Sequence, residues 1–189
     1  NDIMPGLLAR SANRLTLRAA HTTKDEHIIR RRWLLVDSDA VRPAGISSTD
    51  EQRATAINRT AEIRDWLHTQ GWPGPVSADS GNGGHLLYSI ELSNTIQETD
   101  LLKRCLIALG LRFNDERVIV DPSTYNASRI CKLYGTLAAK GDSIPGWPHR
   151  VAKLIGMPDI IKPVSRELLE QLAAMVPEMP KSKASTQND

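Results

Sequence analysis

Two aspartates stand close together at the end of an apolar run in the first quarter of the chain. The segment WLLVDSD, residues 33–39, ends in Asp37 and Asp39, which are separated by one serine. In an extended strand, side chains two residues apart leave the same face, about 6–7 Å apart along the backbone. Carboxylates at this spacing suit two Mg²⁺ ions about 3.5–4 Å apart, an arrangement used in phosphoryl transfer. A third aspartate, Asp121, ends another apolar run and is the next candidate ligand.

Each of these aspartates also has an ordinary structural explanation. A DxD pair occurs often by chance, and Asp121 opens DPS, which is typical of a turn with Asp in its first position. Two carboxylates so close repel each other, and apolar surroundings make their charges harder to bury. We therefore expect bound metal ions to neutralise them.

A glycine-rich turn lies in the segment DSGNGGHLLY, residues 79–88. Its polar and glycine residues are Ser80, Gly81, Gly83, Gly84 and His85. The glycines let the backbone approach a ligand and present N–H groups to an anion, while the serine and histidine offer side-chain donors. The turn is not a P-loop, because no Lys-Ser or Lys-Thr pair follows the glycines. A plain hairpin turn with an exposed histidine is the structural alternative.

Positive charge gathers just after the third aspartate. Arg129, Lys132 and Lys140 follow Asp121 with one further carboxylate to balance them before residue 143. Cations beside a metal-bound carboxylate become favourable when more negative charge arrives, as a triphosphate would supply. The alternative is a solvated basic surface.

Composition and charge narrow the class of protein. Of the 189 residues, 40% are hydrophobic and 24% are charged, which is ordinary for a globular domain, and the net charge is +2. Residues 1–36 and 121–155 are basic, whereas residues 37–120 are acidic. The basic segments suit a polyanion such as nucleic acid, and equally an ordinary solvated surface. No apolar run approaches the roughly 20 residues that span a bilayer, so we expect no membrane association.

The two cysteines give no sign of a metal site. Cys105 and Cys131 lie in apolar surroundings without CxxC or His-pair spacing. We therefore expect both to be core residues of a protein in a reducing compartment. The chain begins with Asn1 rather than Met, which leads us to expect an excised fragment.

The elements that position these residues alternate between strands and helices. Strands are predicted at 33–39, 75–79, 85–92, 117–121 and 128–137, and helices at 6–20, 50–70, 97–111 and after a cap at Ser165. This order predicts an α/β or α+β domain with a mixed sheet around a central hairpin. Residues 1–177 are expected to form the domain, and residues 178–189 a polar tail.

Taken together, three motifs resemble the archaeo-eukaryotic primase superfamily, in particular its bacterial, phage and plasmid primase-polymerase branch. LLVDSD resembles the first motif, an apolar strand that ends in DxD. SGNGGH resembles the second, a Ser-to-His turn that holds nucleotide phosphates. VIVDPSTYNASRICKLYGTLAAKGD resembles the third, an apolar strand that ends in an acid and is followed by Arg and Lys. The likeness covers about residues 20–155.

This resemblance implies an α+β primase catalytic core with an RRM-like half and a mixed sheet flanked by helices. Asp37, Asp39 and Asp121 would be the catalytic residues and would hold two Mg²⁺ or Mn²⁺ ions. The residues expected to bind the incoming dNTP or NTP are Ser80, Gly81, Gly83, His85, Asn126, Arg129, Lys132 and Lys140.

The implied activity is template-dependent nucleotidyl transfer, by a DNA primase or polymerase that extends a nucleic-acid 3′ hydroxyl. The partners would be a single-stranded DNA template and a primer, with Arg30, Arg31 and Arg32 as candidate phosphate contacts. Many relatives carry a helical priming module or a helicase in the full-length protein, so we expect this chain to elongate better than it initiates. The expected location is the bacterial cytoplasm, with a phage or plasmid as one source of the gene.

Three other classes of function stay open. A metal-dependent nuclease would also use clustered aspartates, but it has little need of a triphosphate site. A DxD glycosyltransferase would bind a sugar nucleotide without a template. A non-catalytic nucleic-acid-binding module of a replication or defence system would keep the fold without turnover.

Overall fold

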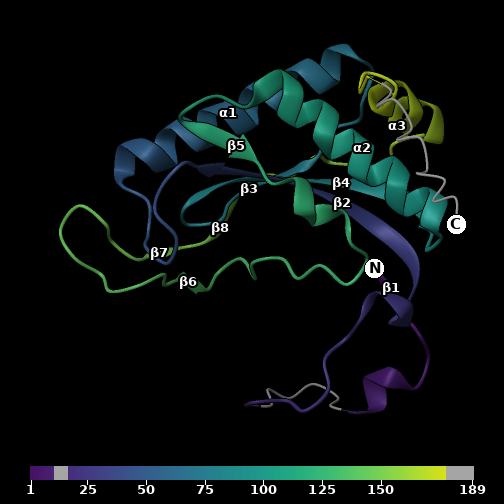
Figure 1. The fold of residues 1–189 in the computed structure, drawn as a ribbon, viewed down its shortest axis with the longest axis horizontal. Helices are drawn as coiled ribbons and strands as arrows, with labels where there is room; N and C mark the ends of the chain where they lie inside the picture. The colour runs from purple at the N-terminus through teal and green to yellow at the C-terminus, as the bar shows by residue number, and fades with distance from the viewer. Residues whose placement is uncertain (11–16, 178–189) are drawn as a thin grey trace, which may run out of the picture.

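Three helices cover one face of a curled antiparallel sheet in the computed structural model, which describes residues 1–10 and 17–177 (Figure 1). The helices are α1 (Asp50–Thr69), α2 (Ile96–Phe113) and α3 (Arg166–Ala173). The sheet has the order β1-β2-β4-β3-β8, and β5 also pairs with β2. Its strands are β1 (Asp2–Ile3), β2 (Ile28–Ala40), β3 (Val76–Asp79), β4 (Gly83–Ser93), β5 (Val118–Val120) and β8 (Lys153–Gly156). A separate pair joins β6 (Leu137–Ala138) to β7 (Arg150–Val151), and short 3₁₀ turns span Leu7–Arg10, Asp25–His27 and Pro122–Tyr125.

The α+β class is confirmed, but the predicted mixed sheet is wrong, since every strand pair among the described residues is antiparallel. Helix α1 connects β2 to β3, which run in the same direction, but β4 lies between these strands. Helix α2 likewise connects β4 to β5, and β2 lies between them. Each helical connection passes over one strand, so parallel strands never become neighbours.

The apolar pattern of the sequence explains the helix-covered face. Along β2, Leu34 and Val36 alternate with residues of the other face and are almost fully buried. They pack with Tyr88 and Ile90 of β4 and with side chains of all three helices, including Ile63 of α1. The opposite face of the sheet, here called the open face, therefore carries Leu35, Asp37 and Asp39 (residues 35, 37 and 39 of β2).

The helix boundaries follow local sequence signals. Helix α1 begins after Thr49, whose hydroxyl accepts the N–H of Gln52 at 3.1 Å, and Gln52 Oε1 accepts the N–H of Thr49 at 3.0 Å. Helix α3 begins after Ser165, as predicted. Helix α2 continues to Phe113, two residues past the end predicted at residue 111, and Asn114 caps it.

Two predicted elements are corrected. The strand predicted over residues 128–137 is wrong, because only Leu137–Ala138 pairs there, and Gly135 has a φ of +93° that interrupts an extended run. Residues 127–140, here called the strap, instead run along the side of the sheet opposite the helices (Figure 1). Of the helix predicted over 6–20, the structure has one short turn, Leu7–Arg10; residues 11–16 lie outside the described part of the chain, and 17–20 are not helical.

Close contact between β4 and α1 depends on a glycine. A Cβ on Gly84 would lie 2.1 Å from the hydroxyl oxygen and 2.7 Å from the Cβ of Thr60. Thr60 is buried, and its hydroxyl donates to the carbonyl of Ala56 at 2.8 Å, so it has no free direction in which to move. Only glycine lets the strand that carries His85 pack this closely on the helix.

Replacing Gly84 by alanine should therefore destabilise the fold. We expect Gly84→Ala to lower the free energy of unfolding by about 1–3 kcal/mol, the usual cost of overpacking a well-packed core. Chemical denaturation measures this change. Gly156→Ala on β8 is the matched control, because a Cβ there meets nothing within 4 Å and should cost much less. Equal losses for the two variants would contradict the packing argument.

Candidate active site

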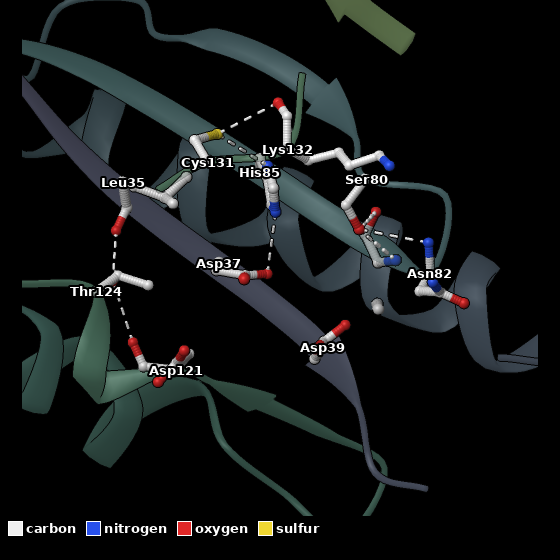
Figure 2. Close-up of polar contacts among 12 residues, drawn as sticks. Leu35, Asp37, Asp39, Ser80, Asn82, His85, Asp121, Thr124, Cys131 and Lys132 are labelled. Atoms are coloured by element: carbon white, nitrogen blue, oxygen red, sulfur yellow. Dashed lines mark hydrogen bonds and ion pairs between the residues drawn. The ribbon is translucent and has the colours of Figure 1, made fainter. Parts of the chain in front are cut away.

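Antiparallel pairing brings the three predicted aspartates together on the open face. Asp37 and Asp39 project from alternate positions of β2 (Figure 2). Strand β4 pairs with one edge of β2, and β5 pairs with the other, with Val120 opposite Ser38. The N–H of Asp121 donates to the carbonyl of Asp37 at 2.8 Å. Asp121 therefore stands across from Asp37, but it is not among the residues that line the cleft described below, whereas Asp37 and Asp39 are.

Each aspartate has its own cation in this structure. His85 Nε2 lies 3.3 Å from Asp37 Oδ1, and Arg129 Nη2 lies 2.7 Å from Asp121 Oδ2. Arg42 Nη1 lies 3.4 Å from Asp39 Oδ1. These protein cations offset part of the mutual repulsion of the acids, and the expected metal ions stay a prediction. Arg42 was not among the predicted site residues, although an arginine three residues after a carboxylate is a recognisable partner.

Protonation of His85 strengthens this charge balance. Burial alone lowers the pKa of His85, but its interactions with Asp37 and Cys131 outweigh burial and raise that pKa to about 10. Burial similarly raises the pKa of Asp121, while hydrogen bonds from Ser123 and the charge of Arg129 outweigh it and leave the pKa below its usual range. At neutral pH these shifts favour an imidazolium at His85 and a carboxylate at Asp121.

A cleft of about 710 Å³ lies between the open face and the strap. Its sheet side includes Leu35, Asp37, Asp39 and His85. Its strap side is formed by Arg129, Ile130, Cys131, Lys132, Leu133, Thr136, Ala138, Ala139 and Lys140. The cleft therefore places carboxylates on one wall and cations on the other.

The glycine-rich turn contributes to the cleft differently from the expectation. The N–H groups of Asn82 and Gly83 donate to the Ser80 hydroxyl at 3.3 and 3.0 Å. The N–H of Gly81 donates to Oδ1 of the buried Asp79 at 2.7 Å. Since these amides are used inside the turn, an anion in the cleft would meet side chains instead.

Most, but not all, of the predicted nucleotide-binding residues line this cleft. Ser80, His85, Arg129, Lys132 and Lys140 do so. The Lys132 ammonium donates to the carbonyl of Leu137 at 2.7 Å. Gly81, Gly83 and Asn126 are not among the residues that line the cleft; the amide of Asn126 instead contacts Asp25 at 3.4 Å on another part of the surface.

Two residues on the strap complete the surroundings of His85. Tyr134 Oη lies 2.8 Å from His85 Nδ1, and Cys131 Sγ lies 3.8 Å from the same nitrogen. The prediction that Cys131 lies in the core is wrong, because this residue is exposed and lines the cleft, whereas Cys105 is buried as predicted. The contacts of Cys131 and Tyr134 with His85 could not be predicted, because they depend on the course of the strap over the sheet. No local sequence pattern indicates that course.

The carboxylates fit divalent ions only in part as they stand. Within residues 1–10 and 17–177, no three His, Cys, Asp or Glu side chains converge on a preformed metal site. Asp37 Oδ1, however, is buried and makes no hydrogen bond; its contact with His85 is an ion pair. Such an oxygen, beside two further carboxylates, matches the hard ligands that Mg²⁺ and Mn²⁺ take.

The chain matches no protein-family model, no curated protein and no solved structure. No helix in the part of the chain that the structure describes is long and apolar enough to cross a membrane.

The two thiols should differ sharply in reactivity. Partial burial raises the pKa of Cys131, but hydrogen bonding with His85 and Tyr134 outweighs it and lowers that pKa, whereas burial raises the pKa of Cys105 to about 12. At neutral pH we expect a maleimide to label Cys131 at least about tenfold faster, since the thiolate is the nucleophile. Mass spectrometry of the parent, Cys131→Ser and Cys105→Ser measures both rates.

The histidine contact supplies the control for this prediction. His85→Ala should return the Cys131 pKa toward its ordinary value, so labelling should slow at neutral pH and recover as the pH rises above about 8.5. Faster labelling of Cys105, or no effect of His85→Ala on the labelling of Cys131, would contradict the described contacts.

Proposed function

We propose that this chain is a template-dependent nucleotidyltransferase, a primase-polymerase that extends a nucleic-acid 3′ hydroxyl. The observation that carries the proposal is the cleft, whose sheet wall holds Asp37 and Asp39 and whose strap wall holds Arg129, Lys132 and Lys140. Metal-binding acids facing triphosphate-binding cations are what nucleotidyl transfer requires. The motif resemblance to the archaeo-eukaryotic primases supports the same assignment.

In this proposal the acids hold two divalent ions. Asp37, Asp39 and Asp121 would be their ligands. When bound, the ions lower the pKa of the attacking hydroxyl and stabilise charge on the attacking and leaving oxygens. Asp37 Oδ1 accepts no hydrogen bond and lies 3.3 Å from His85 Nε2, so it would be available to an ion once His85 pairs with a phosphate instead.

The cations then bind the nucleotide phosphates. Arg129 and His85 are paired with Asp121 and Asp37 in this structure, and both line the cleft. Once ions neutralise the acids, these two cations become available to the β and γ phosphates, which carry the charge that the acids no longer supply. Lys132 and Lys140 add to the same wall. Their contribution is positioning and charge stabilisation.

The cationic wall favours polymerisation over a nuclease reaction. A nuclease with these acids needs contacts to a nucleic-acid backbone, but no group for a free triphosphate. Here four cationic side chains border a cleft of about 710 Å³, which is within the range of small-ligand sites. This concentration of charge beside the acids fits a nucleoside triphosphate better than one phosphodiester.

Removing the acids should abolish catalysis without unfolding the protein. We expect Asp37→Asn, Asp39→Asn and Asp121→Asn each to lower primer extension by at least about a hundredfold, because a missing charged ligand weakens both ion binding and charge stabilisation. The measurement is extension of a labelled primer on a single-stranded template with Mg²⁺ or Mn²⁺. Asp65→Asn, on the exposed side of α1, should leave extension unchanged. Parental rates in the three site variants would refute the two-metal assignment.

Removing the cations should weaken triphosphate binding. Arg129→Ala and His85→Ala should each cost about 1.5–3 kcal/mol, roughly ten- to a hundredfold in affinity, because each loses a charge-assisted hydrogen bond. Calorimetry with a triphosphate and Mg²⁺ measures this loss. Lys140→Ala is a third test that should not disturb folding, since Lys140 is exposed and its backbone carbonyl, which the substitution keeps, accepts the hydroxyl of Ser47 at 3.3 Å.

Matched substitutions outside the cleft serve as controls for these affinities. Arg64→Ala and His68→Ala change the same residue types on the exposed part of α1 and should bind triphosphate as the parent does. If the parent binds no triphosphate, or if all the cleft variants bind as tightly as the parent, the nucleotide site is absent and the polymerase proposal fails.

A further inference from the structure

The open face of the sheet carries an exposed tryptophan next to the cleft. Trp33, Leu35 and Asp37 stand opposite Ser89, Leu87 and His85 of β4, so they occupy alternate positions and share one face. Leu35 already lines the cleft. Trp33 therefore lies on the same face as the sheet side of the cleft, beyond Leu35 in the direction away from Asp39.

The indole of Trp33 is partly exposed, and only a small residue faces it across the strand pair. The residue opposite Trp33 is a serine, and the register of β2 against β4 shifts between Arg31 and Trp33, which marks a β-bulge. Bulges re-aim side chains beside functional sites. Trp33 remains 37% exposed, whereas Leu34, which points to the helices, is 1% exposed.

The three arginines before Trp33 differ in their partners. Arg31 stands opposite the buried Leu92 and is itself buried, with hydrogen bonds to Asn94 and Thr99, so the expectation that it contacts a template is wrong. Arg32 is paired with acids on β1 and β4.

Arg30 is the arginine left for a ligand. The alternation with Arg31 turns Arg30 to the open face. It is exposed and stands opposite Asp2 of β1; Arg32 makes the ion pair with Asp2 and lowers its pKa most, and the charge of Arg30 adds a smaller effect in the same direction. An aromatic side chain and an exposed cation with no ion pair of its own among the described residues therefore stand three residues apart on the strand that leads to Asp37.

We propose that Trp33 and Arg30 form a binding surface for single-stranded nucleic acid, with a base stacked on the indole and a phosphate paired with the guanidinium. The proposal rests on the proposed function, because it extends the path of the strand that enters the cleft. Exposed aromatic side chains on a sheet stack bases without sequence preference, and nearby cations follow the backbone.

The spacing fits a short stretch of nucleotides. Trp33 precedes Asp37 by four residues, or about 13 Å along a strand. At about 3.4 Å for each stacked nucleotide, this distance corresponds to about four nucleotides between the reacting end and the stacked base. A strand that occupies the cleft would therefore reach Trp33 without leaving the sheet.

Binding of oligothymidylate tests the surface directly. With a labelled strand of about twelve nucleotides, Trp33→Ala and Trp33→Leu should each raise the dissociation constant about tenfold, the usual effect of losing one stack. Trp33→Phe should stay near the parent because it keeps an aromatic face. Parental affinity in both Trp33→Ala and Trp33→Leu would overturn the proposal.

Two further measurements separate stacking from general destabilisation. Arg30→Gln should lower the slope of log affinity against log salt by about one, whereas Arg32→Gln should change it much less. Oligothymidylate should quench the intrinsic fluorescence of the parent, and this quenching should fall in Trp33→Phe but not in the matched variant Trp147→Phe. Equal salt slopes in the two arginine variants, or equal quenching in the two tryptophan variants, would contradict the assigned contacts.

Triphosphate affinity distinguishes this proposal from the proposed function. Trp33→Ala should bind triphosphate and Mg²⁺ as the parent does, because the indole lies outside the phosphate wall. If the parent binds triphosphate, and Trp33→Ala binds the oligonucleotide as tightly as the parent, the binding surface is refuted but the polymerase function is not. If Trp33→Ala binds the oligonucleotide more weakly than the parent, but the parent binds no triphosphate, the polymerase function is refuted but the binding surface is not. A Trp33-dependent dimer without strand binding would mean that the face binds a second copy instead.

Discussion

Mutual repulsion among three carboxylates is the constraint on which the site depends. Asp37, Asp39 and Asp121 lie on neighbouring strands, and each is held beside a cation from a different part of the chain. Two of these cations, His85 and Arg129, also face the cleft. The cations that neutralise these carboxylates in the absence of ligand are thus the cations that would bind a triphosphate. In the proposed function, metal binding and nucleotide binding would therefore be coupled through these shared partners, because each ligand would replace an internal ion pair that the other releases.

The parts of this arrangement that arise from local regularity could be predicted from the sequence. The period of a strand places Asp37 and Asp39 on one face, and capping residues such as Thr49 and Ser165 set where helices begin. Strand order could not be predicted, since the same alternation of strands and helices fits parallel and antiparallel neighbours. The strap was mistaken for a strand because its apolar residues resemble one, although Ile130 and Leu133 are exposed. Its position, and with it the contacts of Cys131, depends on distant pairing.

The same strands carry apolar side chains on the face that packs against the helices and charged side chains on the open face. Val36 and Asp37 are neighbours on β2, yet one is buried against the helices and the other contributes charge to the cleft. The buried side fixes the register, because a shift of one residue would turn every side chain to the other face. Gly84 lets β4 approach α1 closely, next to His85. Packing of the apolar side chains against the helices therefore fixes the positions of the charged side chains on the open face.

The pairing of β5 with β2 has a consequence for how the molecule forms. Val120 pairs with Ser38 across more than eighty intervening residues, so this edge of the sheet cannot close before residue 120 has been made. Contacts between residues so far apart in sequence form slowly, because a large loop must close first. A nascent chain would thus carry Asp37 and Asp39 without Asp121 while β2, α1, β3, β4 and α2 have already been made. In the proposed function, the polypeptide would gain its full set of metal ligands only when β5 docks against β2.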